Sequence, residues 1–338
     1  GTGYSAVAAG YFHTVALKSD GSLWAWGHNA YGQLGDGSTE DSLVPKLIDT
    51  GYSAIAAGSL HTVALKPDGS LWSWGSNVDG QLGDGTTSAS LVPKRIGGGY
   101  SAVAAGSLHT VALKSDGSLW TWGFNLGGQL GDGSTTDRHV PTRIGAGYAA
   151  IAAGGTHSVF LRFDGSLWAA GLNSNGQLGD GTTAERHVPR QIGAGYAAAA
   201  VGRGSSGSHT VALKWDGSLW AWGLNGTGQL GDGTTADSLV PKQIDTGYGT
   251  GDVSAPAAPA GLAATPAGPS EISLSWTAAA DDAGVAWYKV YRNDVAVGSP
   301  SGTTYSDTGL SPSTAYNYAV AACDIAWNCS ALSAGVSA

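Results

Sequence analysis

The string Gly32-Gln33-Leu34-Gly35-Asp36-Gly37 is the first of five copies of G-Q-L-G-D-G in this chain of 338 residues. The five glutamines lie at positions 33, 81, 129, 177 and 229, so the string recurs every 48 residues and once after 52. A histidine keeps the same phase, at positions 13, 61, 109, 157 and 209. A period in the forties, composed of short apolar runs and glycine turns, is typical of β-propeller blades.

One repeat is expected to form four strands, which in the first copy span residues 5–10, 13–18, 23–27 and 43–48. Asp20-Gly21, between the second and third strands, predicts a two-residue hairpin turn because glycine tolerates a positive φ. Such a turn pairs Leu17 with Trp24 and Val15 with Trp26. We therefore expect these four large side chains on one face of the blade, and smaller ones on the other, namely Ala16, Ala25 and Leu23.

The fourth repeat departs from this pattern at two positions. Ala170 replaces the second tryptophan, and Phe160 stands where the other copies have alanine. The two-residue turn places these two positions on opposite faces, so neither change compensates for the other. We expect the fourth blade to be irregular.

All five copies share the pattern G-x-x-H-T-V-A-L-K-x-D-G-S-L-W-x-W-G-x-N-x-x-G-Q-L-G-D-G-T-T, with minor departures, followed by V-P. Over residues 1–248 this pattern resembles the regulator of chromosome condensation repeat family. The resemblance implies an all-β fold, a β-propeller of four-stranded blades with repeats 1–50, 51–98, 99–146, 147–194 and 195–248. The best-known members of that family have seven blades. Five copies leave two alternatives, a five-bladed ring or an open segment of a longer array.

The remainder of the chain has a different composition. Residues 249–260 are rich in Gly, Ala and Pro and are expected to form a linker. Residues 261–338 resemble a fibronectin type III domain, an immunoglobulin-like β-sandwich, with Trp276 in one strand and Tyr288–Arg292 in another. The resemblance implies that Tyr316 is the tyrosine-corner residue, whose hydroxyl bonds to the backbone upstream.

The two cysteines of the chain, Cys323 and Cys329, flank a short segment near the C-terminal end of the sandwich. We predict a disulfide between them, because strand ends on either side of a short loop come within bonding reach. A disulfide implies an oxidising compartment, which is consistent with an extracellular or cell-surface location. We expect the source to be bacterial. Two reduced thiols in a cytosolic protein are the alternative.

Charge and hydropathy exclude two classes of partner. The formal net charge is −9, with only 16 Lys and Arg residues and no basic block, so we expect no binding of nucleic acid. No apolar run approaches the ~18–20 residues of a membrane span. Because the chain starts at Gly1 and contains no Met, we expect further sequence upstream.

Catalytic and metal-binding patterns are weak. Each repeated histidine occurs once per blade with no second ligand at metal spacing, which favours a place in the scaffold over a metal site. The aspartate of each G-Q-L-G-D-G string lies in a turn with too few carboxylates nearby for calcium. We therefore predict no catalytic residue, no cofactor and no metal, and a chain that is not an enzyme.

These features leave four candidate functions. The first is a non-enzymatic extracellular or cell-surface interaction module, with the propeller as a platform for a protein partner and the sandwich as a spacer. The second is a structural subunit of a self-assembling surface appendage, in which the partner is the chain itself. The third is a carbohydrate-binding accessory module with a glycan ligand. Guanine-nucleotide exchange on a small GTPase, the activity of the family's namesake, is disfavoured by the lack of basic segments.

Comparison of the repeats with one another predicts the binding face. The turns between second and third strands are nearly constant, whereas the loops on the opposite end of the blades vary. A face that meets an asymmetric partner diverges between copies, and aromatic residues are favoured as interface anchors. Drift of exposed loops is the alternative explanation. The predicted binding-face residues are Tyr11, Phe12, His28, Tyr31, Leu60, Val78, Leu108, Phe124, Leu126, Leu172, Arg203 and Leu224.

Overall fold

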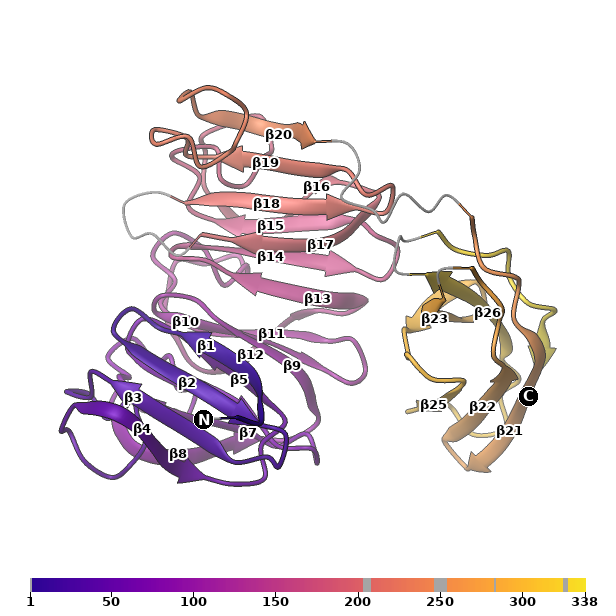
Figure 1. The fold of residues 1–338 in the computed structure, drawn as a ribbon, viewed down its shortest axis with the longest axis horizontal. Helices are drawn as coiled ribbons and strands as arrows, with labels where there is room; N and C mark the ends of the chain where they lie inside the picture. The colour runs from indigo at the N-terminus through magenta and orange to yellow at the C-terminus, as the bar shows by residue number, and fades with distance from the viewer. Residues whose placement is uncertain (1, 203–207, 246–253, 283, 325–327) are drawn as a thin grey trace.

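A computed structural model describes residues 2–202, 208–245, 254–282, 284–324 and 328–338 (Figure 1). Over these ranges every regular element is a β-strand, which confirms the all-β class. The described ranges hold no helix of the length and hydrophobicity that crossing a membrane requires.

Five four-stranded sheets follow one another along the chain, each in the order of its strands (Figure 1). We call them blades 1 to 5. Blade 1 comprises β1 (Tyr4–Ala9), β2 (His13–Lys18), β3 (Leu23–Gly27) and β4 (Ser42–Asp49), within one residue of the predicted strands. Blades 2 and 3 comprise β5 (Ala54–Ala57), β6 (His61–Leu65), β7 (Leu71–Gly75) and β8 (Ser90–Gly97), then β9 (Tyr100–Ala105), β10 (His109–Lys114), β11 (Leu119–Gly123) and β12 (Arg138–Gly145). Blades 4 and 5 comprise β13 (Tyr148–Ala153), β14 (His157–Arg162), β15 (Leu167–Gly171) and β16 (Arg186–Gly193), then β17 (Tyr196–Val201), β18 (His209–Lys214), β19 (Leu219–Gly223) and β20 (Ser238–Asp245).

The hairpin register differs from the predicted one by one residue. Lys18 pairs with Ser22 across the turn, since the Lys18 amide donates to the Ser22 carbonyl at 3.0 Å. The loop therefore contains three residues, 19–21, and ends at Gly21 with φ +80°. A three-residue hairpin with glycine in the left-handed region is a common alternative to the two-residue turn. The predicted pairs Leu17–Trp24 and Val15–Trp26 are thus wrong, and Leu17 pairs with Leu23.

This register gives each blade an aliphatic face and a tryptophan face. In blade 1 Val15 pairs with Ala25, and Ala16 pairs with Trp24. The aliphatic face of blade 1 packs against the tryptophan face of blade 2 in one buried cluster, whose members are Val15, Leu17, Leu23, Ala25, Leu34, Tyr52, Ala57, Ala64 and Trp74. Both faces of an interior blade are buried, which explains the absence of strict polar alternation in the sequence.

The corrected register also makes blade 4 regular. Ser158 pairs with Ala170 and Phe160 with Trp168, so the two substituted positions share a face. Phe160 is fully buried, and its ring lies 5.9 Å from that of Tyr148, where the other interior blades have a tyrosine–tryptophan contact. Phenylalanine thus fills the space that the missing tryptophan leaves. The expectation of an irregular blade was wrong because it rested on the two-residue turn.

One pair of hydrogen bonds recurs at each boundary between blades, and an indole adds a third bond at every boundary except the one between blades 3 and 4. Across the first, the His13 Nε2 atom lies 3.0 Å from the Thr62 hydroxyl, which donates to the Gln33 carbonyl at 2.8 Å. The indole of Trp74 donates to the same carbonyl at 3.0 Å. Gly35 lies so close to this indole that a β-carbon on it would come within 2.6 Å of the Trp74 nitrogen. The G-Q-L-G-D-G string is therefore the docking edge for the next blade, and the histidine belongs to the scaffold, as predicted.

The set is incomplete at the two ends of the propeller. Trp26 in blade 1 is only half-buried, and in the described residues its indole nitrogen has no acceptor. In blade 5 the ring of His209 is half-buried and forms no hydrogen bond to a described side chain. Packing between inner strands runs from β1 to β17 but is not repeated between β17 and β1. The blades thus form an open arc and not a closed ring (Figure 1).

The C-terminal part forms a sandwich of two sheets, ordered β21-β22-β25 and β24-β23-β26-β27. Their strands are β21 (Ala260–Gly268), β22 (Glu271–Thr277), β23 (Val285–Arg292), β24 (Val295–Gly298), β25 (Thr304–Thr308), β26 (Asn317–Asp324) and β27 (Val336–Ser337). The Tyr316 hydroxyl accepts a hydrogen bond from the Ser311 amide at 3.1 Å, as the tyrosine corner requires. Cys323 and Cys329 form the predicted disulfide. Of the expected linker 249–260, residues 249–253 lie outside the described ranges.

Candidate interaction surfaces

The variable loops gather at one end of the blades, as the repeat comparison predicts. The loop between β1 and β2 lies beside the loop between β3 and β4, since the His28 amide donates to the Phe12 carbonyl at 2.8 Å. The first of these loops also bonds across blades: the Tyr11 amide donates to the Ser59 carbonyl, and the Ser59 amide to the Ser107 carbonyl. We call this end the loop face and the opposite end the turn face.

Four predicted residues form one aromatic cluster on the loop face of blade 1. The Tyr11 and Phe12 ring centroids lie 6.2 Å apart, those of Phe12 and His28 6.1 Å, and those of His28 and Tyr31 6.4 Å. Phe12 is 68% exposed, and Tyr11 and Tyr31 are each more than 40% exposed. The side-chain amide of Gln33 forms a 2.7 Å hydrogen bond with the Nδ1 atom of His28 and so fixes the position of this ring. Large exposed rings that are fixed in place are suited to anchor a protein partner.

The other predicted binding-face residues do not join this cluster through ring contacts. Val78 and Leu126 are exposed at their loop tips, at 66% and 68%. Five are partly buried, namely Leu60, Leu108, Phe124, Leu172 and Leu224. Arg203 lies outside the described residues. The structure therefore concentrates the exposed aromatic area of the loop face on blade 1.

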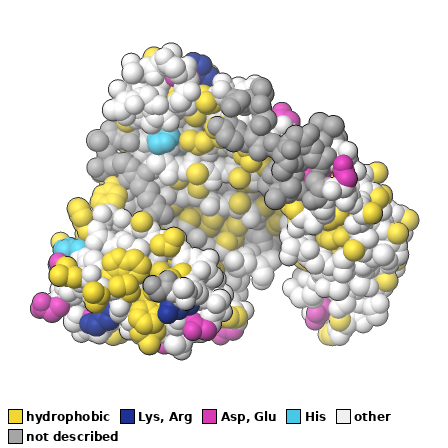
Figure 2. Space-filling model, in the orientation of Figure 1, with side chains coloured by type: hydrophobic (Ala, Val, Ile, Leu, Met, Phe, Trp, Pro, Cys, Tyr) yellow, Lys and Arg dark blue, Asp and Glu magenta, His cyan; other side chains and the backbone are white. Residues whose placement is uncertain are grey.

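The inner strands line a hollow at the centre of the arc, with a volume of about 500 Å³ (Figure 2). The side chains that line it are apolar and small, with alanines from all five blades and branched residues such as Val7 and Ile151. Val7 is 70% exposed because its strand, β1, belongs to blade 1, which no other blade covers at the start of the arc.

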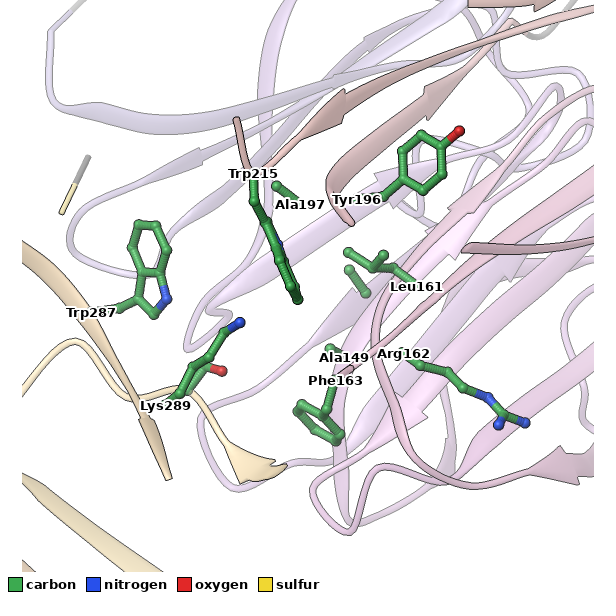
Figure 3. Close-up of a pocket in the computed structure, with 11 residues that line it drawn as sticks. Ala149, Leu161, Arg162, Phe163, Tyr196, Ala197, Trp215, Trp287 and Lys289 are labelled. Atoms are coloured by element: carbon green, nitrogen blue, oxygen red, sulfur yellow. The ribbon is translucent and has the colours of Figure 1, made fainter. Parts of the chain in front are cut away.

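The turn face carries a second surface, which sequence comparison missed. Phe163 and Trp215, from the turns of blades 4 and 5, face strand β23 of the sandwich across a crevice (Figure 3). The Lys289 ammonium lies 3.7 Å from the centroid of the Trp215 ring, a cation–π contact between the two parts of the chain. Burial lowers the pKa of Lys289. The repeat comparison describes these turns as nearly constant, and Phe163 and Trp215 are their two aromatic exceptions.

The crevice consists of three adjoining cavities of about 200, 550 and 510 Å³. Phe163 lines all three, and Trp215 and Lys289 line the first two. Alternation along β23 supplies the sandwich side: Tyr288 and Val290 are buried in the core, so Trp287, Lys289 and Tyr291 point out of it.

The repeated aspartates hold the long loops of the loop face. Asp36 accepts from the Asn29 side chain at 3.1 Å and from the Ser38 hydroxyl at 2.8 Å, and it pairs with Lys46. Burial alone would raise the pKa of Asp36, but these bonds outweigh it and lower the pKa to about 2. Equivalent bonds recur in the other four blades. In the described ranges no three His, Cys, Asp or Glu side chains are grouped closely enough to hold a metal ion.

Known proteins resemble the two parts of the chain separately. At the level of whole folds, human WBSCR16 superposes with a TM-score of 0.63 at 25% identity, covering 72% of this chain and 67% of that one. Prp20p from Saccharomyces cerevisiae superposes with a TM-score of 0.64 at 25% identity, covering 72% and 63%.

Relatives by sequence share the fibronectin type III part rather than a catalytic part. An alpha-amylase of Niallia circulans is 48% identical over 87 residues, which is 26% of this chain and 7% of that protein. Exoglucanase B of Cellulomonas fimi is 46% identical over 95 residues, 28% and 9% respectively. Chitinase Chi52 of Paenibacillus xylanexedens is 37% identical over 134 residues, 38% and 22%. The chain thus spans less than a quarter of the length of these relatives.

Family profiles agree with the architecture. The fibronectin type III profile matches residues 257–328. The RCC1-like domain profile matches residues 1–261, which is most of the chain, and both kinds of domain are non-catalytic modules. This chain therefore belongs to the RCC1-like domain family and carries a fibronectin type III domain after its propeller.

Proposed function

We propose that this chain is a non-enzymatic extracellular interaction module that binds a protein partner through the loop face of its propeller. The observation that carries the proposal is the aromatic cluster of blade 1. In it Tyr11, Phe12 and Tyr31 are exposed, and the His28 ring lies between those of Phe12 and Tyr31. Interfaces are enriched in such anchors, and scaffold packing does not require them there, since in the described residues the other blades have no exposed aromatic ring on this face. The Cys323–Cys329 disulfide supports an oxidising, extracellular setting.

The test is capture of partners from culture supernatant and from the cell surface by the intact chain. Replacement of Tyr11, Phe12 and Tyr31 by Ser removes the exposed rings, together with the contact of 3.3 Å between the Tyr11 hydroxyl and the buried Ser107 hydroxyl. We expect this variant to lose capture while its thermal unfolding is unchanged. The matched control is Val78→Ser with Leu126→Ser, which removes the exposed aliphatic residues of blades 2 and 3. Capture that survives the first variant and is lost in the second would place the interface elsewhere on the loop face.

A second function, carbohydrate-binding accessory module, has an observation of its own in its favour. The relatives of the fibronectin type III part are named as an amylase, an exoglucanase and chitinases, enzymes that act on polysaccharides. We propose that the present chain binds such a polymer rather than cleaving it. Sedimentation with insoluble chitin or cellulose tests this function, and recovery of all the protein in the supernatant would reject it.

A further inference from the structure

In the part of the chain that the structure describes, no blade covers the tryptophan face of blade 1. Tyr4 is 40% exposed there, whereas the equivalent tyrosines of blades 2 to 5 are at most 6% exposed. Leu43 is 96% exposed, and the Trp26 indole is half-buried. Figure 2 shows hydrophobic side chains gathered over this blade, at the lower left. In blade 2 the same three positions contact the preceding blade.

Blade 5 leaves the opposite, aliphatic face uncovered. Its Val211, Leu213 and Leu219 side chains are partly exposed, and so are those of His209 and Gln229. The equivalent residues of blades 1 to 4 are all buried, because this face packs against the following blade. After blade 5 the next described strands belong to the sandwich, so they do not add a blade to the arc.

The glycines of blade 5 also leave a place for a neighbour. On the first glycine of each G-Q-L-G-D-G string in blades 1 to 4, a β-carbon would come within 2.3–2.5 Å of a side chain of the next blade, as Gly32 does with Leu91. Among the described residues, a β-carbon on Gly228 would meet no atom nearer than the Thr234 carbonyl oxygen at 4.0 Å. Blade 5 thus has the same clearance for a following blade as blades 1 to 4.

Neither end blade has the character of a cap. A stacked array whose ends face solvent has terminal repeats with a polar outer face. Blade 1 instead exposes Tyr4, Trp26 and Leu43, and blade 5 exposes aliphatic side chains and glycines. These are the residue types that form the interior boundaries. The two uncovered faces are therefore the two halves of one boundary, at opposite ends of a single molecule.

Placed together, the two faces supply every partner that an interior boundary uses. At the boundary between blades 1 and 2, an indole and a threonine hydroxyl donate to the glutamine carbonyl, the hydroxyl also bonds to the histidine ring, and a leucine covers the first glycine of the string. Blade 1 holds the tryptophan, the threonine and the leucine, and blade 5 holds the glutamine, the histidine and the glycine. The pairs are Trp26 with Gln229, Thr14 with His209, and Leu43 with Gly228.

We propose that the chain assembles head to tail, with the aliphatic face of blade 5 of one copy docked on the tryptophan face of blade 1 of the next. The observations favour a second copy as the occupant, because each copy carries both halves of the boundary and leaves both uncovered. This surface is separate from the loop face proposed above to bind a protein partner.

The assembly repeats from copy to copy, because the contact joins two different faces. All five blades of one copy already line a single hollow, so the next copy continues along the axis of the arc. The expected product is therefore a helical filament and not a closed ring. Association depends on concentration, so a dilute solution contains single arcs.

The test is the mass of the assembly over a series of chain concentrations, measured by sedimentation velocity, with electron microscopy of the concentrated sample. The mass of the parent chain should rise beyond that of two copies, and filaments should be visible. Gly228→Asn blocks the blade 5 face, because asparagine accepts the positive φ of this position and its side chain occupies the place of the next copy's Leu43. Trp26→Glu blocks the blade 1 face, because its carboxylate faces the Gln229 carbonyl. Each variant should raise the Kd of association at least about tenfold.

The matched control is Gly51→Asn. Gly51 also has a positive φ and open space around it, but it lies between blades 1 and 2, outside both end faces. This control should assemble like the parent chain. Circular dichroism and thermal unfolding check that every variant is folded, and Leu43→Glu, which removes a fully exposed side chain of the blade 1 face, replaces Trp26→Glu if that variant does not fold.

An equimolar mixture of Gly228→Asn and Trp26→Glu distinguishes a head-to-tail contact from a symmetric one. Each variant keeps the face that the other has lost, so the mixture should form a particle of two copies and grow no further. Single copies of the parent chain at every concentration would overturn the proposal. Assembly that neither variant weakens would place the contact elsewhere and overturn it, and so would a mixture without the two-copy particle.

Discussion

The boundaries inside the arc and the two ends of the arc are made of the same residue types in different surroundings. Inside, Trp74, Trp122 and Trp222 are fully buried and each donates to the glutamine carbonyl of the preceding blade at 3.0 Å. At the start of the arc Trp26 occupies the same position, but no preceding blade covers it. Comparing Trp26 with the interior tryptophans therefore separates two contributions to stability: packing within the residue's own blade and contact with the preceding blade.

Each end of the arc leaves one side of a blade boundary uncovered. Blade 1 presents the Thr14 and Trp26 half, and blade 5 presents the His209 and Gln229 half. Gln229 is partly exposed, whereas Gln33, Gln81, Gln129 and Gln177 are fully buried. A stacked array of this kind gains stability from each interface between neighbours, so its terminal blades are held on one side only.

The largest expected difference between the two regions is for the tryptophans. Trp122→Ala removes a fully buried indole and leaves a cavity, at a cost of about 3–5 kcal/mol in the free energy of unfolding. Trp26→Ala removes a half-buried indole with no acceptor and should cost about 1 kcal/mol or less. Urea unfolding of both variants, followed by circular dichroism, makes the comparison. Equal losses would mean that blade 1 is covered in solution.

The boundary between blades 3 and 4 tests whether one ring can replace another. Phe160→Ala should cost about 3–4 kcal/mol, because blade 4 has Ala170 in place of the buried tryptophan. Adding Ala170→Trp should recover most of this loss, since the double variant has the arrangement of blades 2, 3 and 5. Gly131 faces Ala170 as Gly35 faces Trp74, but the Pro189 ring also packs against Gly131, so the new indole must displace that ring. Thermal unfolding of the single and double variants measures the recovery, and a double variant no more stable than Phe160→Ala would contradict the shared face.

The third contrast is in pH dependence. Burial, with smaller contributions from His109 and His209, lowers the pKa of His157 to about 3. In the unfolded chain this histidine takes up a proton near its ordinary pKa of about 6.5, so the unfolded state binds more protons between these values. The stability that neutral His157 contributes is therefore lost as pH falls below about 6.5, on the order of 1–2 kcal/mol by pH 5. His157→Asn should flatten this slope, while His209→Asn at the open end should change it much less. Free energies of unfolding at pH 7, 6 and 5, measured for the parent chain and both variants, give the three slopes. Equal slopes for the two variants would contradict the assignment to His157.

Much of this architecture follows from the sequence, because the repeat supplies five independent copies of one pattern. Period, strand positions and scaffold histidines could be predicted since each is constrained by packing in every copy. The register could not, because Asp20-Gly21 suits both a two-residue turn and a three-residue turn ending at Gly21. That one residue decided which face carries Trp24 and Trp26, and with it the interpretation of Phe160.

Of the two candidate sites, the sequence revealed one and not the other. The aromatic cluster of blade 1 was found because four divergent positions stand close together in two loops of one repeat. The crevice was not, because its second wall comes from Trp287, Lys289 and Tyr291, and repeat comparison carries no information about a different domain. Phe163 and Trp215 were the available signal, as the two aromatic residues in a turn that is otherwise small.

The smallest expected contrast concerns a hydroxyl. Thr110 is fully buried and donates to the Gln81 carbonyl at 2.8 Å, while its oxygen also bonds to the His61 ring at 3.2 Å. Thr110→Val keeps the volume but leaves the histidine nitrogen without this partner, at a cost of about 1 kcal/mol or somewhat more. Thr14 holds the same position in blade 1, where no preceding blade offers a carbonyl, so Thr14→Val should be neutral within about 0.5 kcal/mol. Because valine and threonine have the same shape, any difference between the two variants reports the boundary hydrogen bonds and not packing. Equal effects would show that the hydroxyl acts within its own blade, and the contrast between interior and ends would then rest on the indole alone.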